Sequence, residues 1–290
     1  MRPKRGLCFA LLAALLASSG GFLCITGIET DPTLTSLSST LVRIGVNLVF
    51  VLFVQFIVRG ERSLPWGTGD PELWLWGALG AFTILTYFAS LQALGPGEAT
   101  LLQGVQGFVV AALAPRFLRQ RSSLLTWAAV CGGLGGLAIA FPISVGATRL
   151  EGRALALASG LFAGSAYLVL SATKGRHKPD TISFYWCVVS LVIAGAAAAL
   201  NNATLPLGGP GIPWLIAAGF AGSLAQWFTT LAYRTAPAAM VASTAYLIPL
   251  FSLLGDAFVR QKHVESHIWH GAILVVAAGV GLPILQARNT

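Results

Sequence analysis

Long apolar runs separated by short polar stretches follow one another along almost the whole chain. A helix needs about 20 predominantly apolar residues to cross a lipid bilayer. Ten runs approach that length, at residues 7–28, 37–58, 73–93, 97–114, 124–141, 154–173, 182–200, 213–233, 236–258 and 268–285. The pattern predicts an all-α multi-pass membrane protein with ten transmembrane helices and no soluble domain beside them.

The pattern also occurs twice. Residues 91–99 read LQALGPGEA, and residues 231–239 read LAYRTAPAA, 140 positions later (231 − 91). Nearer the start of each copy, residues 6–19 match residues 152–165 at an offset of 146 (152 − 6). Each copy therefore holds five predicted spans, an odd number, so the two copies must cross the bilayer in opposite directions.

Inverted repeats place a pseudo-two-fold axis in the membrane plane and a binding site between the halves at the bilayer midplane. We predict a first five-helix repeat over residues 5–142, a connector over 143–152 and a second five-helix repeat over 153–286. The central cavity predicted by this arrangement suits a transporter.

Composition and charge support a membrane protein. Hydrophobic residues make up 56% of the chain and charged residues only 10%, which cannot form a soluble surface. With the N-terminus cytoplasmic, Arg149, Arg153, Arg260 and Lys262 fall outside and Arg43 lies within a span, which leaves 13 of the 18 Lys and Arg residues inside (18 − 4 − 1). The positive-inside rule then predicts both termini in the cytoplasm of a cytoplasmic (inner) membrane protein. The net charge of +8 thus reflects topology and anionic lipid, and we expect no nucleic-acid partner.

The basic start of the chain, residues 1–5, resembles a signal peptide. The apolar run that follows is long enough to span the bilayer, so we expect it to be retained as the first helix. The four cysteines lie in different apolar segments without the spacing of a metal site and are expected to be free thiols: Cys8, Cys24, Cys131 and Cys187.

Several short motifs point to a family. An apolar span contains LLASS at residues 15–19, Arg43 lies in the second span, and a hairpin turn before an Ala-rich span occurs in both copies. With its two copies of five spans, the chain resembles the drug/metabolite transporter superfamily, and within it the ten-helix EamA-type branch. The resemblance implies a multi-pass transporter, often an exporter of amino acids, nucleotide-like metabolites or toxic amphipaths. The family usually has a Trp in the first helix of a repeat, whereas this chain has Ala17 and Ala163, so an aromatic contact there is absent or supplied by another residue.

Two polar pairs give the most specific functional signal. Gln103 and Gln106 are three residues apart and share one helix face, and their equivalents at an offset of 140 are Ser243 and Tyr246. Polar side chains in an apolar span are costly unless they meet partners or water. We predict that the four residues line a wet central cavity that binds substrate. The alternative is hydrogen bonding between helices that only holds the bundle together.

Arg43 is the only cation well inside a predicted span. A guanidinium at that depth needs a carboxylate, a phosphate, backbone carbonyls or water. It either anchors a carboxylate of the substrate or serves as a structural arginine that caps helix ends or reaches outward. Trp186 lies near the corresponding region of the second copy, so any contact made by Arg43 is one-sided.

Further candidates come from the other spans, each with a plainer alternative. Thr86 and Gln226 occupy equivalent places in the third helix of each copy, beside Tyr87 and Trp227. These four residues, together with Ser19 and Ser165, are added to the predicted substrate site, although the serines also suit close helix packing and Trp227 also suits contact with lipid. Pro249 removes a backbone donor inside a span and is predicted to be a hinge or gate, or else a static kink. Four tryptophans near span ends are expected at the membrane interface: Trp66, Trp74, Trp76 and Trp214.

The sequence lacks the residues that an intramembrane enzyme or a metal site would need. An intramembrane enzyme needs a nucleophile with a base, paired aspartates or a metal centre at mid-depth, and the sequence offers none. His263, His267 and His270 are spaced for one helix face but lack further ligands, so we expect no metal and no cofactor.

Glu98 and Asp256 lie at span ends and are not predicted to carry protons. The sequence thus predicts a secondary transporter for small amphipathic metabolites, foremost amino acids or related compounds. We expect it to work by alternating access in the direction of export, as a monomer or homodimer in the lipid bilayer. The alternative is a lipid scramblase or an intramembrane enzyme.

Overall fold

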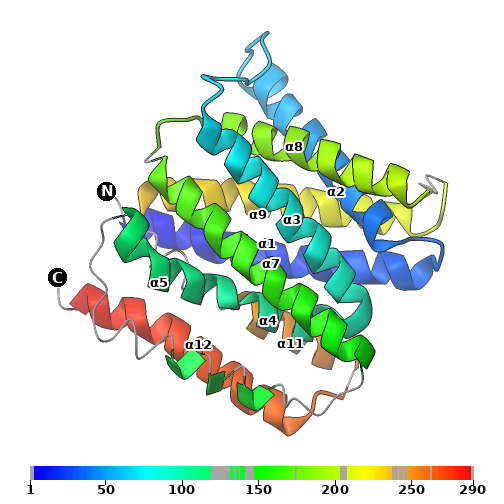
Figure 1. The fold of residues 1–290 in the computed structure, drawn as a ribbon, viewed down its shortest axis with the longest axis vertical. Helices are drawn as coiled ribbons and strands as arrows, with labels where there is room; N and C mark the ends of the chain where they lie inside the picture. The colour runs from blue at the N-terminus through cyan, green and yellow to red at the C-terminus, as the bar shows by residue number, and fades with distance from the viewer. Residues whose placement is uncertain are drawn as a thin grey trace.

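The computed structural model describes residues 3–118, 131–133, 135–136, 138–140, 147–173, 175–202, 208–236, 241, 244, 247–261 and 263–288. Its helices are α1 (Pro3–Thr30), α2 (Ser36–Phe53), a π-helical turn η1 (Val54–Val58), α3 (Pro71–Leu94), α4 (Pro96–Gln103), α5 (Val105–Leu118), α7 (Ala147–Ala172), α8 (Pro179–Leu200), α9 (Ile212–Thr235), α11 (Leu247–Phe258) and α12 (Ser266–Arg288) (Figure 1).

Within these ranges the protein consists of helices and loops without a strand, and seven helices are long and apolar enough to cross a membrane. The predicted all-α multi-pass membrane protein is confirmed to that extent. The predicted count of ten spans stays a prediction, because most of 124–141 and most of 236–246 lie outside the described residues. All four cysteines are free thiols, as predicted.

Local sequence sets the helix ends. Thr35 begins α2 with a capping box, since its hydroxyl accepts from the Ser38 backbone N–H while the Ser38 hydroxyl accepts from the Thr35 N–H at 2.7 Å. Prolines start α3 and α8, where a missing backbone donor costs nothing. Gly95 alone separates α3 from α4, and its φ of 83° belongs to the left-handed region that glycine adopts freely. The predicted tight hairpin between the third and fourth spans is therefore present.

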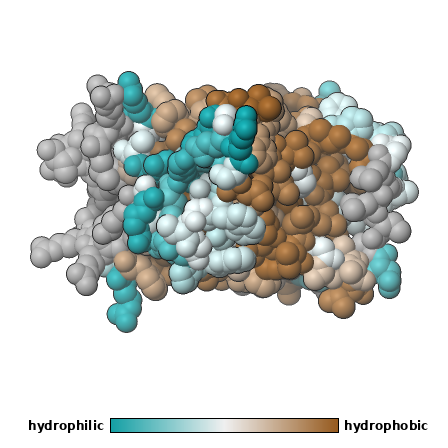
Figure 2. All heavy atoms as spheres, turned by 90° about the horizontal axis from the view of Figure 1, so that it is seen from above, coloured by the Kyte–Doolittle hydropathy of each residue, from teal (hydrophilic) through white to brown (hydrophobic). Residues whose placement is uncertain are grey.

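The long helices run back and forth along one direction (Figure 1). The start of α1 and the end of α12 lie at the same end of the bundle, here called the terminal end, and the opposite end is called the far end. On the face shown in Figure 2, hydrophobic residues form a broad area across the middle, while hydrophilic ones gather toward the terminal end. Large apolar side chains such as Val49, Phe53 and Val192 are exposed, as expected of a surface that faces lipid.

The helices pack in a crossed pattern. The most extensive contacts join α1 to α9 and α3 to α7, while α2 and α8 contact each other and pack on α9 and α3, respectively. In α7, Gly160 and Gly164 lie one turn apart on a single face that packs against α4 and α5. A methyl group at Gly160 would come within 2.7 Å of the Gln103 carbonyl oxygen, and one at Gly164 within 2.8 Å of the Gln106 carbonyl oxygen. Glycine is therefore needed for these backbones to approach.

The fourth predicted span is interrupted. Gly104 forms a turn between α4 and α5, and its N–H donates to the carbonyls of Thr100 at 3.0 Å and Leu101 at 3.1 Å. A methyl group at Gly104 would lie 3.8 Å from Cγ of Pro249 in the first turn of α11. The interruption therefore lies beside the proline predicted as a hinge or gate.

Helix α7 begins earlier than the sequence pattern suggests. The apolar run starts near Ala154, but the helix starts at Ala147, so the second half of the predicted connector at 143–152 is helical. The physical reason is that a helix extends beyond the apolar core when its polar first turns have partners. Here Arg149 and Arg153 are paired with Glu98 across the bundle.

We expect Gly160→Ala to destabilise the bundle and Gly45→Ala to leave it intact. The added methyl in α7 would lie 2.4 Å from Val105 and force the helices apart, which costs about 1–3 kcal/mol. Nothing lies within 4 Å of a methyl at Gly45, so the better helix propensity of alanine should stabilise α2 by up to about 1 kcal/mol. Unfolding of the purified protein in mixed micelles titrated with sodium dodecyl sulfate measures both changes. Equal effects of the two substitutions would contradict the packing described here.

Candidate substrate cavity

A cavity of about 160 Å³ lies among α1, α2, α3, α4, α5, α7, α8, α9 and α11. Its wall on α1 is made by alanines, which keep one side wide. Its polar lining comprises Arg43, Thr83, Thr100, Gln103, Gln106, Gln226, Thr229 and Thr244, and its aromatic lining comprises Trp76, Tyr87, Tyr167, Trp186 and Tyr233. The cavity therefore combines a few polar groups with large rings, a composition common in ligand sites.

Five of the residues predicted from sequence meet in this cavity. Arg43, Tyr87, Gln103, Gln106 and Gln226 all line it, although each comes from a different helix. These five residues, grouped from the sequence as one predicted site, therefore lie around one cavity.

The polar groups around the glutamines are only partly satisfied. The side-chain amide of Gln103 donates to the Ser159 hydroxyl at 2.7 Å, and that hydroxyl donates to the Thr83 carbonyl at 3.1 Å. Nε2 of Gln226 is buried and has no hydrogen-bond partner among the described residues. An amide donor without a partner in a cavity wall is available to a ligand.

Other predicted residues lie elsewhere. The hydroxyls of Ser19, Ser165 and Thr86 donate to the carbonyl four residues earlier in their own helices, at 2.9, 2.9 and 2.7 Å, and none of the three lines the cavity. Trp227 also lies off the cavity, with its ring 6.2 Å from that of Phe50 in an edge-to-face contact. Ser243 and Tyr246 fall outside the described residues.

Arg43 points into the bundle. A methyl group at Gly222 of α9 would lie 2.8 Å from the guanidinium carbon, so the guanidinium rests against the bare backbone of this glycine. The same carbon lies 5.6 Å from the centre of the Phe88 ring. The alternative of an arginine that reaches outward to the membrane surface therefore does not fit.

The charge of Arg43 has no acidic partner. All ten Asp and Glu residues of the chain lie within the described ranges, and none forms an ion pair with Arg43. Nε is buried without a hydrogen-bond partner among the residues that the structure describes. The contact with Phe88 is worth about 0.5–2 kcal/mol, which does not replace a hydrogen-bonded anion for a cation inside a bilayer.

The aromatic part of the cavity is what the sequence argument missed. Trp76 was expected at the membrane interface because it lies near the start of a span, but it is only 3% exposed and lines the cavity, so that prediction is wrong for this residue. Its ring lies 6.0 Å from that of Tyr167, which stacks on Tyr233 at 5.0 Å. Ala17 and Ala163 also line the cavity, so its rings come from other positions, among them Tyr167 one turn beyond Ala163 on α7.

Ion pairs close the far end of the bundle. Glu98 at the start of α4 accepts from Arg149 at 3.1 Å and from Arg153 at 2.8 Å. Asp256 near the end of α11 accepts from the Gly97 N–H at 2.7 Å and from Arg260 at 2.9 Å, and Arg260 also pairs with Glu29 at the end of α1. The two acids that were not predicted as proton carriers are therefore engaged in linking α1, α4, α7 and α11.

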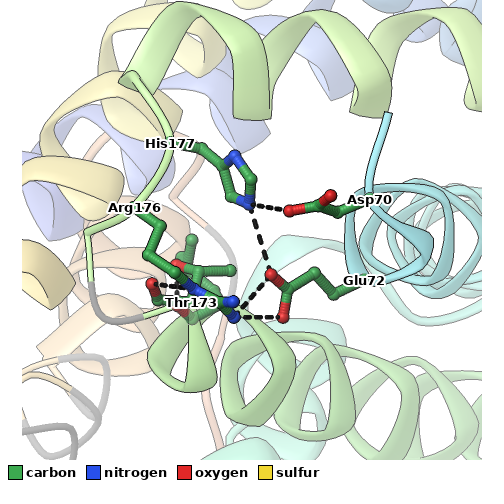
Figure 3. Close-up of polar contacts among 6 residues, drawn as sticks. Asp70, Glu72, Thr173, Arg176 and His177 are labelled. Carbon is green, nitrogen blue, oxygen red and sulfur yellow. Dashed lines mark hydrogen bonds and ion pairs between the residues drawn. The ribbon is translucent and has the colours of Figure 1, made fainter. Parts of the chain in front are cut away.

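A second polar cluster lies at the terminal end. Both carboxylate oxygens of Glu72 accept from Arg176, at 2.6 and 2.9 Å, while His177 lies 3.3 Å from Asp70 and 3.2 Å from Glu72 (Figure 3). Asp70, Glu72 and His177 could offer ligand atoms to a metal ion, but both carboxylate oxygens of Glu72 already accept from one nitrogen, Nη2 of Arg176. The cluster therefore joins the start of α3 to the segment before α8.

Two neighbouring ion pairs extend this cluster. Lys178 donates to Glu61 at 2.6 Å, and this hydrogen bond holds the pKa of the Glu61 carboxyl below its ordinary value. Arg59 lies 3.3 Å from the buried Asp180. Of the histidines considered for a metal site, His267 lies 3.2 Å from Glu265.

Comparison with known proteins agrees with this architecture. A model of the EamA-like transporter family matches residues 4–141 and 150–282. The pseudopaline exporter CntI of Pseudomonas aeruginosa is 26% identical over 282 residues, which is 96% of each chain. A riboflavin transporter of Rhizobium johnstonii is 30% identical over 206 residues, 70% of this chain and 66% of its own. A solved crystal structure with 16% sequence identity has a TM-score of 0.76 and covers 100% of this chain and 99% of its own, which shows a shared fold.

The two family matches together cover most of the chain, and the relatives are named for transport rather than catalysis. A cavity with polar and aromatic walls, set among membrane-spanning helices, fits such a role. The chain belongs to the EamA-like transporter family and is a multi-pass membrane transporter of small molecules, not an enzyme.

Proposed function

We propose that the chain is a secondary transporter that moves small amphipathic metabolites by alternating access, foremost amino acids or related compounds. In this proposal two inverted five-helix repeats, residues 5–142 and 153–286, enclose the cavity and are joined by residues 143–152. The proposed location is the cytoplasmic membrane, with both termini inside. Equivalent glycine contacts on the two sides of the cavity are the observation that carries the proposal.

These contacts join helices of different repeats. A methyl group at Gly77 in α3 would lie 2.8 Å from Cβ of Val189 in α8, and one at Gly219 in α9 would lie 2.8 Å from Cβ of Val46 in α2. The glycines are 142 positions apart (219 − 77) and the valines 143 (189 − 46). Both contacts therefore exchange partners under one operation, which supports a pseudo-two-fold axis between the repeats. An offset of 142 between α3 and α9 replaces the expected 140, so Gln226 corresponds to Ile84 (226 − 142) and not to Thr86.

The interruption between α4 and α5 supports a binding site in the cavity, because residues on both sides of it line the cavity. Transporters with inverted repeats often bind substrate where a membrane helix is discontinuous, because unsatisfied backbone groups become available there. Here α4 ends at Gln103 and α5 begins at Val105, and both Gln103 and Gln106 line the cavity.

The position of the cavity suggests which state is present. Its lining on α1 runs from Ala10 to Ala17 in a helix that runs from Pro3 to Thr30, and on α9 it extends to Tyr233, two residues before that helix ends. The cavity therefore lies closer to the terminal end, and ion pairs close the far end. The positive-inside rule favours the terminal end as the cytoplasmic one. On that orientation we infer an inward-facing state suited to take up a solute for export. The name of the relative from Pseudomonas aeruginosa supports that direction.

Flux through proteoliposomes tests the proposed function. Liposomes containing the purified protein are loaded with a panel of labelled amino acids and related metabolites, and the efflux rate of each is measured. For any solute that the wild type moves, Gln106→Ala and Gln226→Ala are expected to slow efflux at least tenfold, because each removes an amide from the cavity wall. Asn201→Ala removes an amide from the exposed end of α8 and should leave the rate unchanged. Normal efflux in both cavity variants would place the substrate site elsewhere.

Accessibility of a cavity residue tests alternating access. In a variant without the four native cysteines, Thr229→Cys places a thiol in the cavity, and a charged thiol reagent added at the terminal end should label it. Adding Arg153→Gln and Arg260→Gln removes ion pairs at the far end, which should favour the opposite state and slow labelling several-fold. Arg62→Gln removes an exposed charge and serves as the control. Equal labelling rates in all three proteins would argue against closure by these ion pairs.

A further inference from the structure

The two halves of the cavity present different side chains at equivalent positions. Arg43 in α2 and Trp186 in α8 are 143 positions apart (186 − 43), the same spacing as the paired valines. Each side chain lies against a glycine of the helix opposite: Arg43 against Gly222 in α9, and Trp186 against Gly80 in α3. These glycines are 142 positions apart (222 − 80), so one structural position holds a cation in the first half and an indole in the second.

The glycines make recesses that fit these side chains. A methyl group at Gly222 would lie within 3.0 Å of three guanidinium atoms of Arg43, and a methyl at Gly80 would lie within 2.2 Å of two indole atoms of Trp186. Both side chains also line the cavity, so each is held at its back and open to the cavity at its front. The recesses therefore fix where a charged and an apolar part of a ligand can bind.

The cation side of the cavity is incomplete without an anion. Arg43 pairs with none of the ten acidic residues of the chain, all of which are described, and its Nε has no hydrogen-bond partner among the described residues. Gln226 lies one helical turn beyond Gly222 on α9, and its Nε2 donor is likewise unpartnered in the described part of the chain. A guanidinium and an amide donor on neighbouring positions match the two oxygens of a carboxylate.

Trp186 shares the cavity with other aromatic side chains. Trp186 is 7% exposed, and the rings of Trp76, Tyr167 and Tyr233 line the same cavity, with centroid distances of 6.0 and 5.0 Å along that series. Rings of this kind bind planar or apolar groups by stacking and edge contacts. An ammonium group would meet the charge of Arg43 without a compensating carboxylate in the lining.

We propose that the solute is an amphipathic organic anion, with its carboxylate bound by Arg43 and Gln226 and its planar or apolar part against Trp186. This assignment of a substrate class rests on the proposed transport function and narrows its solutes from amino acids to related compounds without a free ammonium group. The two halves thereby give the cavity a polarity that its symmetry alone would not provide.

Binding of matched probes tests the assignment. Phenylacetate, phenylacetamide and phenethylamine share a ring and differ in charge, and their affinities for the full chain in lipid nanodiscs are measured by equilibrium dialysis with labelled compounds. The wild type is expected to bind phenylacetate at least tenfold more tightly than either of the other two. Phenyl phosphate is included as a further anion, and tighter binding of it than of phenylacetate would overturn the assignment of a carboxylate.

Substitutions then assign the preference to residues. Arg43→Gln should remove the tenfold preference for the anion, Arg43→Lys should keep part of it, and Gly222→Ala should weaken it although Arg43 is retained, because the new methyl displaces the guanidinium. Trp186→Leu should lower the affinity for phenylacetate several-fold while leaving acetate binding unchanged. Arg62→Gln removes an exposed charge and controls for the overall positive field of the protein. Size-exclusion profiles identify any variant that does not fold, and Gly222→Ala and Arg43→Lys keep a cation in the fold.

The outcomes separate this inference from the transport function. A wild type that binds all three probes equally or binds none, or a preference unchanged in Arg43→Gln, overturns the inference. If the protein moves a solute and Arg43→Gln leaves its efflux rate unchanged, the transport function stands and the assignment of an anionic substrate is rejected. Binding with the expected preference in a protein that moves none of the panel solutes would reject transport and leave the anion site standing.

Discussion

Close approach of helices at glycine residues is the constraint on which the rest of the structure depends. Lipid tails are as apolar as the helices, so the hydrophobic effect does not drive helices together in a bilayer, and packing contacts must do so. Gly77 and Gly219 bring α3 against α8 and α9 against α2. One turn further along, Gly80 and Gly222 receive the side chains that reach the cavity. The contacts that assemble the bundle therefore also position the walls of the cavity.

Charge is distributed according to its cost in the membrane. At both ends of the bundle, acids and bases are paired, as in Glu98 with Arg153 and Glu72 with Arg176. The Glu72–Arg176 pair is partly exposed and contributes little stability, whereas Arg153 and Glu98 are largely buried, so breaking that pair would leave two charges that need water or new partners. Arg43 differs because it lies deep in the bundle without an acidic partner. An uncompensated cation at that depth is expensive for a membrane protein to keep, which is the reason to assign it a function.

The sequence predicted the fold class, most helix bounds and the residues whose polarity is anomalous in an apolar span. Gln103, Gln106 and Arg43 stood out because polar groups are rare there, and the structure brings them to one cavity. The sequence did not distinguish Trp76 from tryptophans at the membrane interface, because a position near a helix end does not reveal which way a ring points. Ser19 and Ser165 were ambiguous for a related reason, since a hydroxyl in a helix can satisfy itself by bonding to its own backbone.

For the inverted repeats proposed above, duplication followed by divergence would explain how the proposed site acquires direction. Two identical halves related by a two-fold axis would offer a ligand the same groups from both sides, and an amphipathic solute would then bind equally well in two opposite orientations. Replacing one of two equivalent positions by a cation, Arg43, and the other by an indole, Trp186, removes that degeneracy without altering the backbone. The glycines opposite both positions make the exchange feasible, because a recess with no side chain accepts either a guanidinium or a ring. The symmetry of the scaffold can thus be retained for the conformational change while the chemistry of the cavity becomes one-sided.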